Sequence, residues 1–123
     1  MSVLLSSCSL ACAIQPAVRA MAKMVVIYKQ PANPEAFDEH YFGVHIPLAK
    51  KLPGLRKYEV SRGPIVNPRG ASDAYLVGTL HFDDIQALQR AFASPEGEAC
   101  ARDVPNYARP EDMQMFLFED RAV

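Results

Sequence analysis

The sequence predicts an α+β domain with the element order β-α-β-β-α-β. Three observations support this prediction: a β-branched run at residues 24–29 precedes one long helical pattern, two strand-like segments then follow in succession, and a second helical region precedes a last apolar strand. This order is that of the ferredoxin-like split βαβ arrangement. We therefore expect a four-stranded antiparallel sheet with its helices on one face.

The first helix is predicted over residues 33–54, NPEAFDEHYFGVHIPLAKKLPG. Asn33 followed by Pro34 is a favourable N-cap and first-turn pair, and the Pro53-Gly54 pair ends the helix. Apolar side chains recur at helical spacing and form one stripe that we expect to be buried: Phe37, Tyr41, Val44, Leu48 and Leu52.

Two residues interrupt this helical pattern. Gly43 costs about 1 kcal/mol relative to Ala in a helix, and Pro47 has no N–H to donate to the carbonyl of Gly43. The helix is therefore expected to bend near residues 43–47, with a free carbonyl beside His45. A local rule broken next to a histidine indicates a functional site.

The remaining elements follow in order. Asp83 is expected to cap the second helix, with Gln86 completing a capping-box pattern, and Gly78 marks a bulge or a close approach within a strand. The predicted strands cover residues 24–29, 55–64, 74–82 and 112–119, and the later helices cover residues 84–93 and 95–103.

The last strand is apolar on both faces, with Met113, Met115 and Leu117 alternating with Phe116 and Phe118. A four-stranded sheet whose open face is apolar needs a partner to cover it. We expect an isologous homodimer in which two sheets pack face to face, forming a dimeric α/β barrel.

Bulk properties limit the function. A net charge of −1 gives no basic surplus for nucleic acid, and no apolar run is long enough to span a membrane. Three cysteines imply no disulfide framework or metal site, so we expect a cytoplasmic protein. Residues 1–23 lack acidic residues and are interpreted as a disordered or cleaved extension, with export as the alternative, and residues 24–121 as the domain.

Two segments resemble the EthD domain family of the dimeric α/β-barrel superfamily. The first, FDEHYFGVHIPLAKKLPGLRKYEV at residues 37–60, is similar to the family pattern of an aromatic helix, then His-x-Pro-Leu, then Gly-Leu before a strand. The second, SPEGEACARDVPNYA at residues 94–108, resembles the family's Ser-Pro-Glu to Asp-x-x-Asn-aromatic run. The resemblance covers residues 24–120.

This resemblance implies several possible activities. Many family members are described as reductases without a settled reaction. Superfamily neighbours include muconolactone isomerases, quinone-forming monooxygenases, decarboxylases or dehydratases of polyketide metabolism, and haem enzymes. Fold analogy does not select among them. The implied enzyme is a cofactor-independent oxidoreductase, an isomerase or a lyase.

His45 and Tyr41 are the candidate catalytic residues. His45 matches the family histidine, and an imidazole can take and return a proton near neutral pH. Tyr41 lies one turn earlier, where it can orient His45 or donate to a substrate oxygen. The structural alternative is a buried histidine that bonds a backbone carbonyl. The strand residues Tyr28, Tyr58, Arg62 and His81 are candidate pocket residues.

No metal or cofactor is expected. His40 and His45 are five residues apart, which places them about 140° apart on a regular helix, so they cannot share one metal. Haem stays open because it needs a single axial histidine. The sequence therefore favours proton-transfer chemistry on a small hydrophobic or aromatic substrate. A non-catalytic binding or accessory protein of a catabolic pathway is the alternative.

Overall fold

The computed structural model describes residues 21–123, so the predictions for residues 1–20 lie outside the described part of the chain. Strand β1 (Met21–Lys29) lies inside a sheet of order β2-β3-β1-β4 in which every pairing is antiparallel. The other strands are β2 (Lys57–Val60), β3 (Ala74–Phe82) and β4 (Met113–Asp120). The four-stranded antiparallel sheet predicted from the sequence is confirmed.

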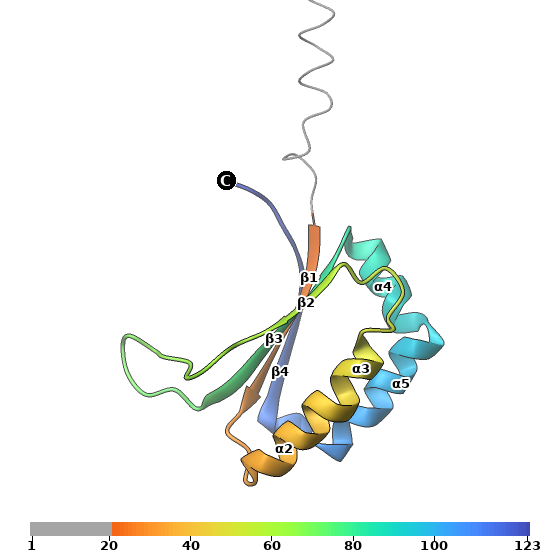
Figure 1. Ribbon diagram of the computed structural model, residues 1–123. Helices are drawn as coiled ribbons and strands as arrows, with labels where there is room; N and C mark the ends of the chain where they lie inside the picture. The colour runs from red at the N-terminus through yellow and green to blue at the C-terminus, as the bar shows by residue number, and fades with distance from the viewer. Residues whose placement is uncertain (1–20) are drawn as a thin grey trace, which may run out of the picture.

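The helices cover one face of this sheet, on the right of Figure 1. The first helical segment comprises α2 (Pro34–His40), the π-helix η2 (Tyr41–His45) and α3 (Ile46–Ala49). The second comprises α4 (Ile85–Ala93) and α5 (Pro95–Asp103), followed by the 3-10 turns η3 (Val104–Asn106) and η4 (Pro110–Asp112). Within residues 21–123, no helix has the length and apolarity needed to cross a bilayer.

The first helix contains a π-helix where the sequence predicts a bend. The N–H of Ile46 donates to the carbonyl of Tyr41, five residues back, because Pro47 has no N–H with which to continue the α-helical ladder. The wider turn changes which side chains face the sheet. Val44 was expected to be buried and is instead 43% exposed, whereas His45 and Ala49 are buried.

Element boundaries differ from the predicted ones at several places. Strand β1 begins at Met21, so residues 21–23, which were interpreted as part of the extension, belong to the sheet. Strand β2 ends at Val60, after which residues 61–73 form an arm that projects from the sheet on the left of Figure 1. Asp84, rather than Asp83, caps α4, because its extended backbone lets its carboxylate accept from the N–H of Ala87 at 2.8 Å. Asp83 binds the guanidinium of Arg56 at 2.6 and 3.0 Å.

The core lies between the sheet and the helices. Every second residue of β1 and β3 is buried against the helical layer, as strand alternation requires. The largest fully buried side chains are those of Tyr41, Phe82 and Leu88. These residues connect the first helical segment, the sheet and α4 in one cluster.

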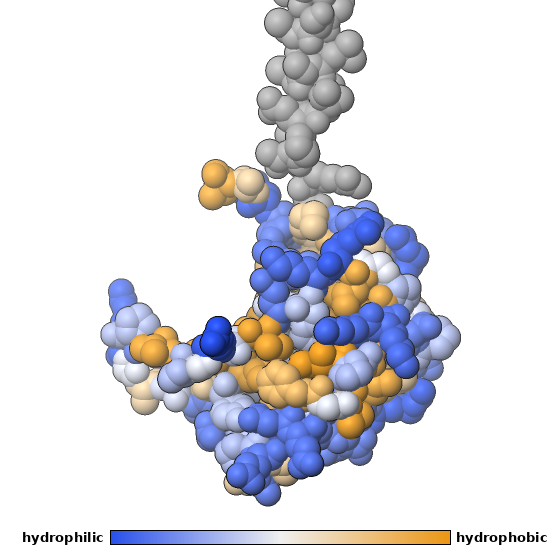
Figure 2. Space-filling view, in the orientation of Figure 1, coloured by the Kyte–Doolittle hydropathy of each residue, from blue (hydrophilic) through white to orange (hydrophobic). Residues whose placement is uncertain are grey.

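Strand β4 forms an edge of the sheet and is exposed on both of its faces. Its register places Phe116 opposite Val25 and Phe118 opposite Lys23, on the face away from the helices. Phe116 is 49% exposed and Phe118 is 41% exposed. Figure 2 shows apolar surface across the middle of the molecule, beside the projecting arm. The described chain therefore leaves large apolar side chains uncovered on its open sheet face.

We expect Gly97→Ala to lower the free energy of unfolding by about 1–3 kcal/mol, measured by urea denaturation. A Cβ at Gly97 would overlap the carbonyl oxygen of Ala91 and lie 2.6 Å from that of Phe92. These backbone atoms of α4 cannot move aside without shifting the helix. Gly43→Ala is the matched control, since its Cβ would meet nothing within 4 Å. It should stay within about 1 kcal/mol of wild type, and equal losses for both variants would contradict this account.

Candidate active site between the helices and the sheet

The side chain of His45 enters the core from the π-helix. Its imidazole stacks on the ring of Tyr41, with ring centroids 5.7 Å apart and planes 19° apart. Its Nδ1 lies 2.9 Å from Oδ2 of Asp103, which is the last residue of α5. One hydrogen bond thus connects the two helical segments beneath the surface.

Asp103 is almost completely buried and receives hydrogen bonds from three side chains. Its Oδ1 lies 2.8 Å from Nε2 of His40 and accepts from Nδ2 of Asn106 at 3.0 Å, while Oδ2 lies near His45. The expectation that His40 and His45 point in different directions was wrong. The π-helix brings residues five apart onto one face, so both imidazoles reach one carboxylate.

The electrostatics of this group fix the protonation of His45. Burial lowers the pKa of His45, although the hydrogen bond and charge of Asp103 oppose this shift. Burial alone would raise the pKa of Asp103, but hydrogen bonds from Asn106, His40 and His45 together hold it below its usual value. An ionised carboxylate only accepts hydrogen bonds. At neutral pH His45 therefore carries its proton on Nδ1 and a lone pair on Nε2.

A cavity of about 180 Å³ lies next to this imidazole. His45, Tyr28, Tyr58 and Cys100 contribute its polar groups, and no Lys, Arg, Asp or Glu of the described part of the chain lines it. Burial raises the pKa of the Cys100 thiol, which keeps it neutral. Within residues 21–123, no hydrogen-bond partner meets Nε2 of His45. Apolar side chains from the sheet and helices form the remaining wall, among them Met24, Val26, Leu80, Val104, Met113 and Met115.

Two pairs of tyrosine hydroxyls stand beside the cavity. The hydroxyls of Tyr41 and Tyr58 are 2.7 Å apart, and those of Tyr28 and Tyr107 are 2.9 Å apart. Burial raises the pKa of all four phenols, so each remains a hydrogen-bond donor. Tyr58 lines the cavity, and Tyr41 lies behind it. A Cβ at Gly78 would lie 3.0 Å from the Tyr41 hydroxyl, which explains the glycine at this close approach.

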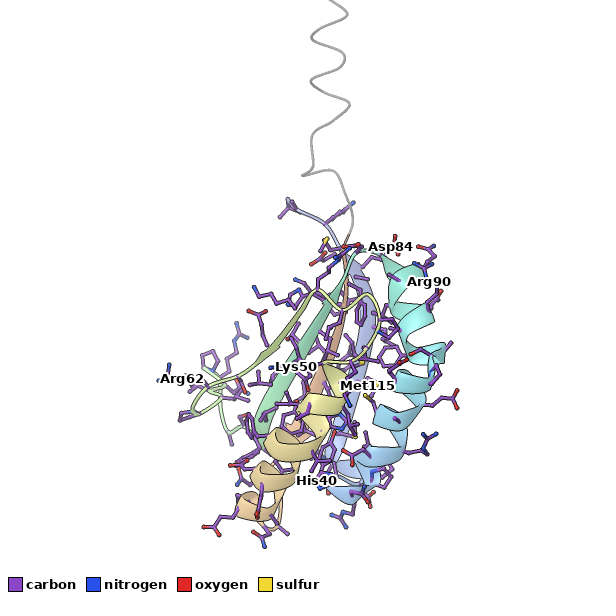
Figure 3. All side chains as sticks on the ribbon, turned by 45° about the vertical axis from the view of Figure 1, so that its right-hand side comes forward. His40, Lys50, Arg62, Asp84, Arg90 and Met115 are labelled. Atoms are coloured by element: carbon purple, nitrogen blue, oxygen red, sulfur yellow. The ribbon has the colours of Figure 1, made fainter. Side chains whose placement is uncertain are left out.

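The other predicted pocket residues lie elsewhere. Arg62 is exposed on the projecting arm, far from the helical layer (Figure 3). His81 occupies the sheet face away from the helices, where its Nε2 lies 2.8 Å from the carboxylate of Glu59. Neither residue lines the cavity beside His45.

Sequence reasoning missed the importance of Asp103 and Tyr107. Both belong to the Asp-x-x-Asn-aromatic run, to which the sequence alone assigned no role in the site. The ring of Tyr107 instead lies 4.8 Å from that of His45, and Asp103 binds both histidines. The role of a buried aspartate can be predicted from sequence only when its partners are known. Here the partners are two histidines that a regular α-helix would place on different sides. Among the described residues, no group of three His, Cys, Asp or Glu side chains could hold a metal ion.

The sequence is similar to a curated protein of Rhodococcus erythropolis, described as an uncharacterized 11.0 kDa protein in the thcB-thcC intergenic region. The two are 34% identical over 100 residues, which cover 81% of this chain and 96% of that protein. A crystal structure of an ethyl tert-butyl ether degradation (EthD) family protein from Bacillus halodurans is 38% identical. It superposes with a TM-score of 0.74 over 81% of this chain and 98% of that chain.

SnoaB, a cofactor-independent oxygenase from Streptomyces nogalater, shares the fold at lower similarity. Its crystal structure is 19% identical, with a TM-score of 0.58 over 86% of this chain and 97% of that chain. Residues 29–111 of this chain match the protein family described as "EthD domain". Those residues contain the π-helix, Asp103 and most of the cavity lining. By sequence and by structure, this chain belongs to the EthD domain family.

Proposed function

We propose that this protein catalyses proton transfer on a small organic molecule bound in the cavity, with His45 as the general acid and base. One observation carries the proposal. The imidazole of His45 is held on one side by a buried carboxylate, while its other nitrogen meets no partner within residues 21–123 and the ring borders an apolar cavity. This is the arrangement of a positioned base supported by an orienting acid group.

The site supplies the parts that such a reaction needs. Nε2 of His45 removes a proton from carbon beside a carbonyl, and Asp103 stabilises the imidazolium that forms. The negative charge moves to the carbonyl oxygen, where the phenol of Tyr58 can donate a hydrogen bond, with Tyr41 holding that phenol in place. Returning the proton to another carbon gives an isomerisation, and loss of a leaving group gives a lyase reaction. The residues in place need no cofactor for these steps.

The cavity limits the substrate. Its volume of about 180 Å³ is close to that of an engineered cavity of about 150 Å³ that binds benzene. A charged substrate would lose its hydration without gaining a counter-ion, because the wall formed by residues 21–123 contains no Lys, Arg, Asp or Glu. The site therefore suits an uncharged molecule with about one ring and a carbonyl or hydroxyl group. Cofactor-independent oxygenation, the description given to SnoaB, would start with the same proton removal and would need dioxygen as a second substrate to accept the electrons.

A non-catalytic binding or accessory protein is the second candidate. The largely apolar lining favours it, because within residues 21–123 His45 is the one lining side chain of a type whose ordinary pKa lies near neutrality. Such a protein would bind the same class of molecule and would not depend on the lone pair of His45.

We further propose a cytoplasmic homodimer formed through the open sheet face. Phe116 and Phe118 lie on that face at 49% and 41% exposure, together with Val25 and Ile27 of β1. Pairing two such faces would remove these apolar side chains from water. The buried, unpaired Cys100 is compatible with a reducing compartment.

The catalytic proposal is tested by hydrogen–deuterium exchange. Neutral one-ring ketones and lactones are incubated with the protein in D₂O at pD 7, and loss of the C–H signal beside the carbonyl is followed by NMR. We expect the wild-type protein to accelerate exchange in those compounds that bind, and His45→Gln to slow it at least about 100-fold. Saturation-transfer NMR on the same samples reports binding separately.

His81→Gln is the matched control, because this histidine also binds a carboxylate but lies on the opposite sheet face. Its exchange rate should equal that of wild type. If compounds bind to wild type and His45→Gln alike and neither protein accelerates exchange, the catalytic proposal fails and the binding protein is favoured.

The dimer is tested by light scattering at micromolar concentration. We expect wild type at twice the mass of one chain, and Phe116→Lys with Phe118→Lys at the mass of one chain, because two charges would then be buried in the interface. Phe42→Lys is the control: Phe42 is 46% exposed on the first helical segment, so the variant should stay dimeric. A monomeric wild type would refute the face-to-face arrangement.

A further inference from the structure

We propose that His40 is a positioning residue that keeps His45 in its basic form, by holding the proton that Asp103 would otherwise draw onto His45. The inference rests on the proposed role of His45 as a base and adds a second histidine to the site. Its foundation is geometric: one buried carboxylate receives both imidazoles, through different oxygens, at 2.8 and 2.9 Å.

The two imidazoles differ in their access to water. The side chain of His40 is 26% exposed, whereas that of His45 is 9% exposed and borders the cavity. His40 stacks on Tyr107, with ring centroids 5.7 Å apart and planes 24° apart, and Tyr107 also contacts His45. The three rings and the carboxylate therefore form one packed unit with an outer and an inner histidine.

Among the other titratable side chains of residues 21–123 that contact the two imidazoles, Asp103 is the one that is ionised at neutral pH. The titratable side chains that face the two imidazoles come from every adjoining element: Asp103 and Cys100 on α5, Tyr107 after η3, Tyr41 on η2, and Tyr28 and Tyr58 on the sheet. The phenols and the thiol are neutral because burial raises the pKa of each.

The charge balance of the unit allows one added proton and opposes a second. With both imidazoles neutral, the unit carries the charge of Asp103. One proton makes it neutral, and a second would leave a net positive charge beside an apolar cavity. Water reaches the ring of His40 more than that of His45, so a positive charge is better hydrated on the outer ring than on the inner one. A charged His40 then disfavours protonation of His45, which keeps Nε2 available as a base.

The substitution His40→Gln separates the charge of His40 from its hydrogen bond. A glutamine amide can donate to Oδ1 of Asp103 as the imidazole does, but it cannot carry the proton. The proton attracted by Asp103 must then bind His45. We therefore expect the pKa of His45 to rise in this variant, and the base to be lost at a higher pH.

The experiment is an NMR titration of the full-length protein, following the Cε1–Hε1 signals of its three histidines. In His40→Gln, the titration midpoint of His45 should rise by at least about one pH unit, because at an effective dielectric constant of about 20 a positive charge as far as about 12 Å away already has that effect. His81→Gln, at the other sheet face, should leave the midpoint unchanged. An unchanged His45 midpoint in His40→Gln would overturn the inference.

The wild-type protein supplies a test that needs no variant. The His45 signal should shift in two steps, one of them at the midpoint of His40, because the sites are coupled. Independent single-step curves for His40 and His45 would refute the coupling. Neither titration requires a substrate. If the protein fails to catalyse deuterium exchange but the titrations of His40 and His45 are coupled, only the catalytic role of His45 is refuted. If the protein catalyses exchange but the titrations are independent, only the role of His40 is refuted.

Discussion

The buried carboxylate of Asp103 is the interaction on which the site depends. An ionised group at this depth would cost several kcal/mol without partners, because the protein replaces water as its solvent. Three N–H donors from two helical segments form hydrogen bonds with the carboxylate in place of water. The same bonds fix which nitrogen of His45 carries hydrogen and where the end of α5 lies relative to the first helix. The same hydrogen bonds therefore stabilise the packing of the helices and position the candidate base.

The binding of both histidines to Asp103 depends on the π-helix. In a regular α-helix, residues 40 and 45 diverge by about 140°, and a single carboxylate could not reach both. Pro47 interrupts the hydrogen-bond ladder, and the i to i−5 bond from Ile46 to Tyr41 widens the turn. The interruption also moves Val44 out to solvent. One backbone irregularity thus sets the direction of several side chains.

Much of the fold could be predicted from the sequence. Alternation along β3 and the caps at Asn33 and Ser94 are local signals, and the structure agrees with them. The helical stripe was predicted less well, because a periodicity of 3.6 residues assumes an unbroken helix. The sequence does indicate that regular α-helical hydrogen bonding is interrupted near Gly43 and Pro47. It does not indicate that the interruption is a π-turn rather than a bend. Asp103 stayed hidden for this reason, since its importance comes only from partners about 60 positions away.

The π-helix can also be regarded as one extra residue placed inside an otherwise ordinary helix. Removing a single residue between His40 and His45 would place the two histidines four positions apart, which is close to one turn of a regular α-helix. The wide turn accommodates its extra residue locally, so the side chains before and after it would keep their faces and the two histidines would still lie on one side of the helix. In evolutionary terms, one codon can enter or leave this segment without separating the histidine pair and without redesigning the fold.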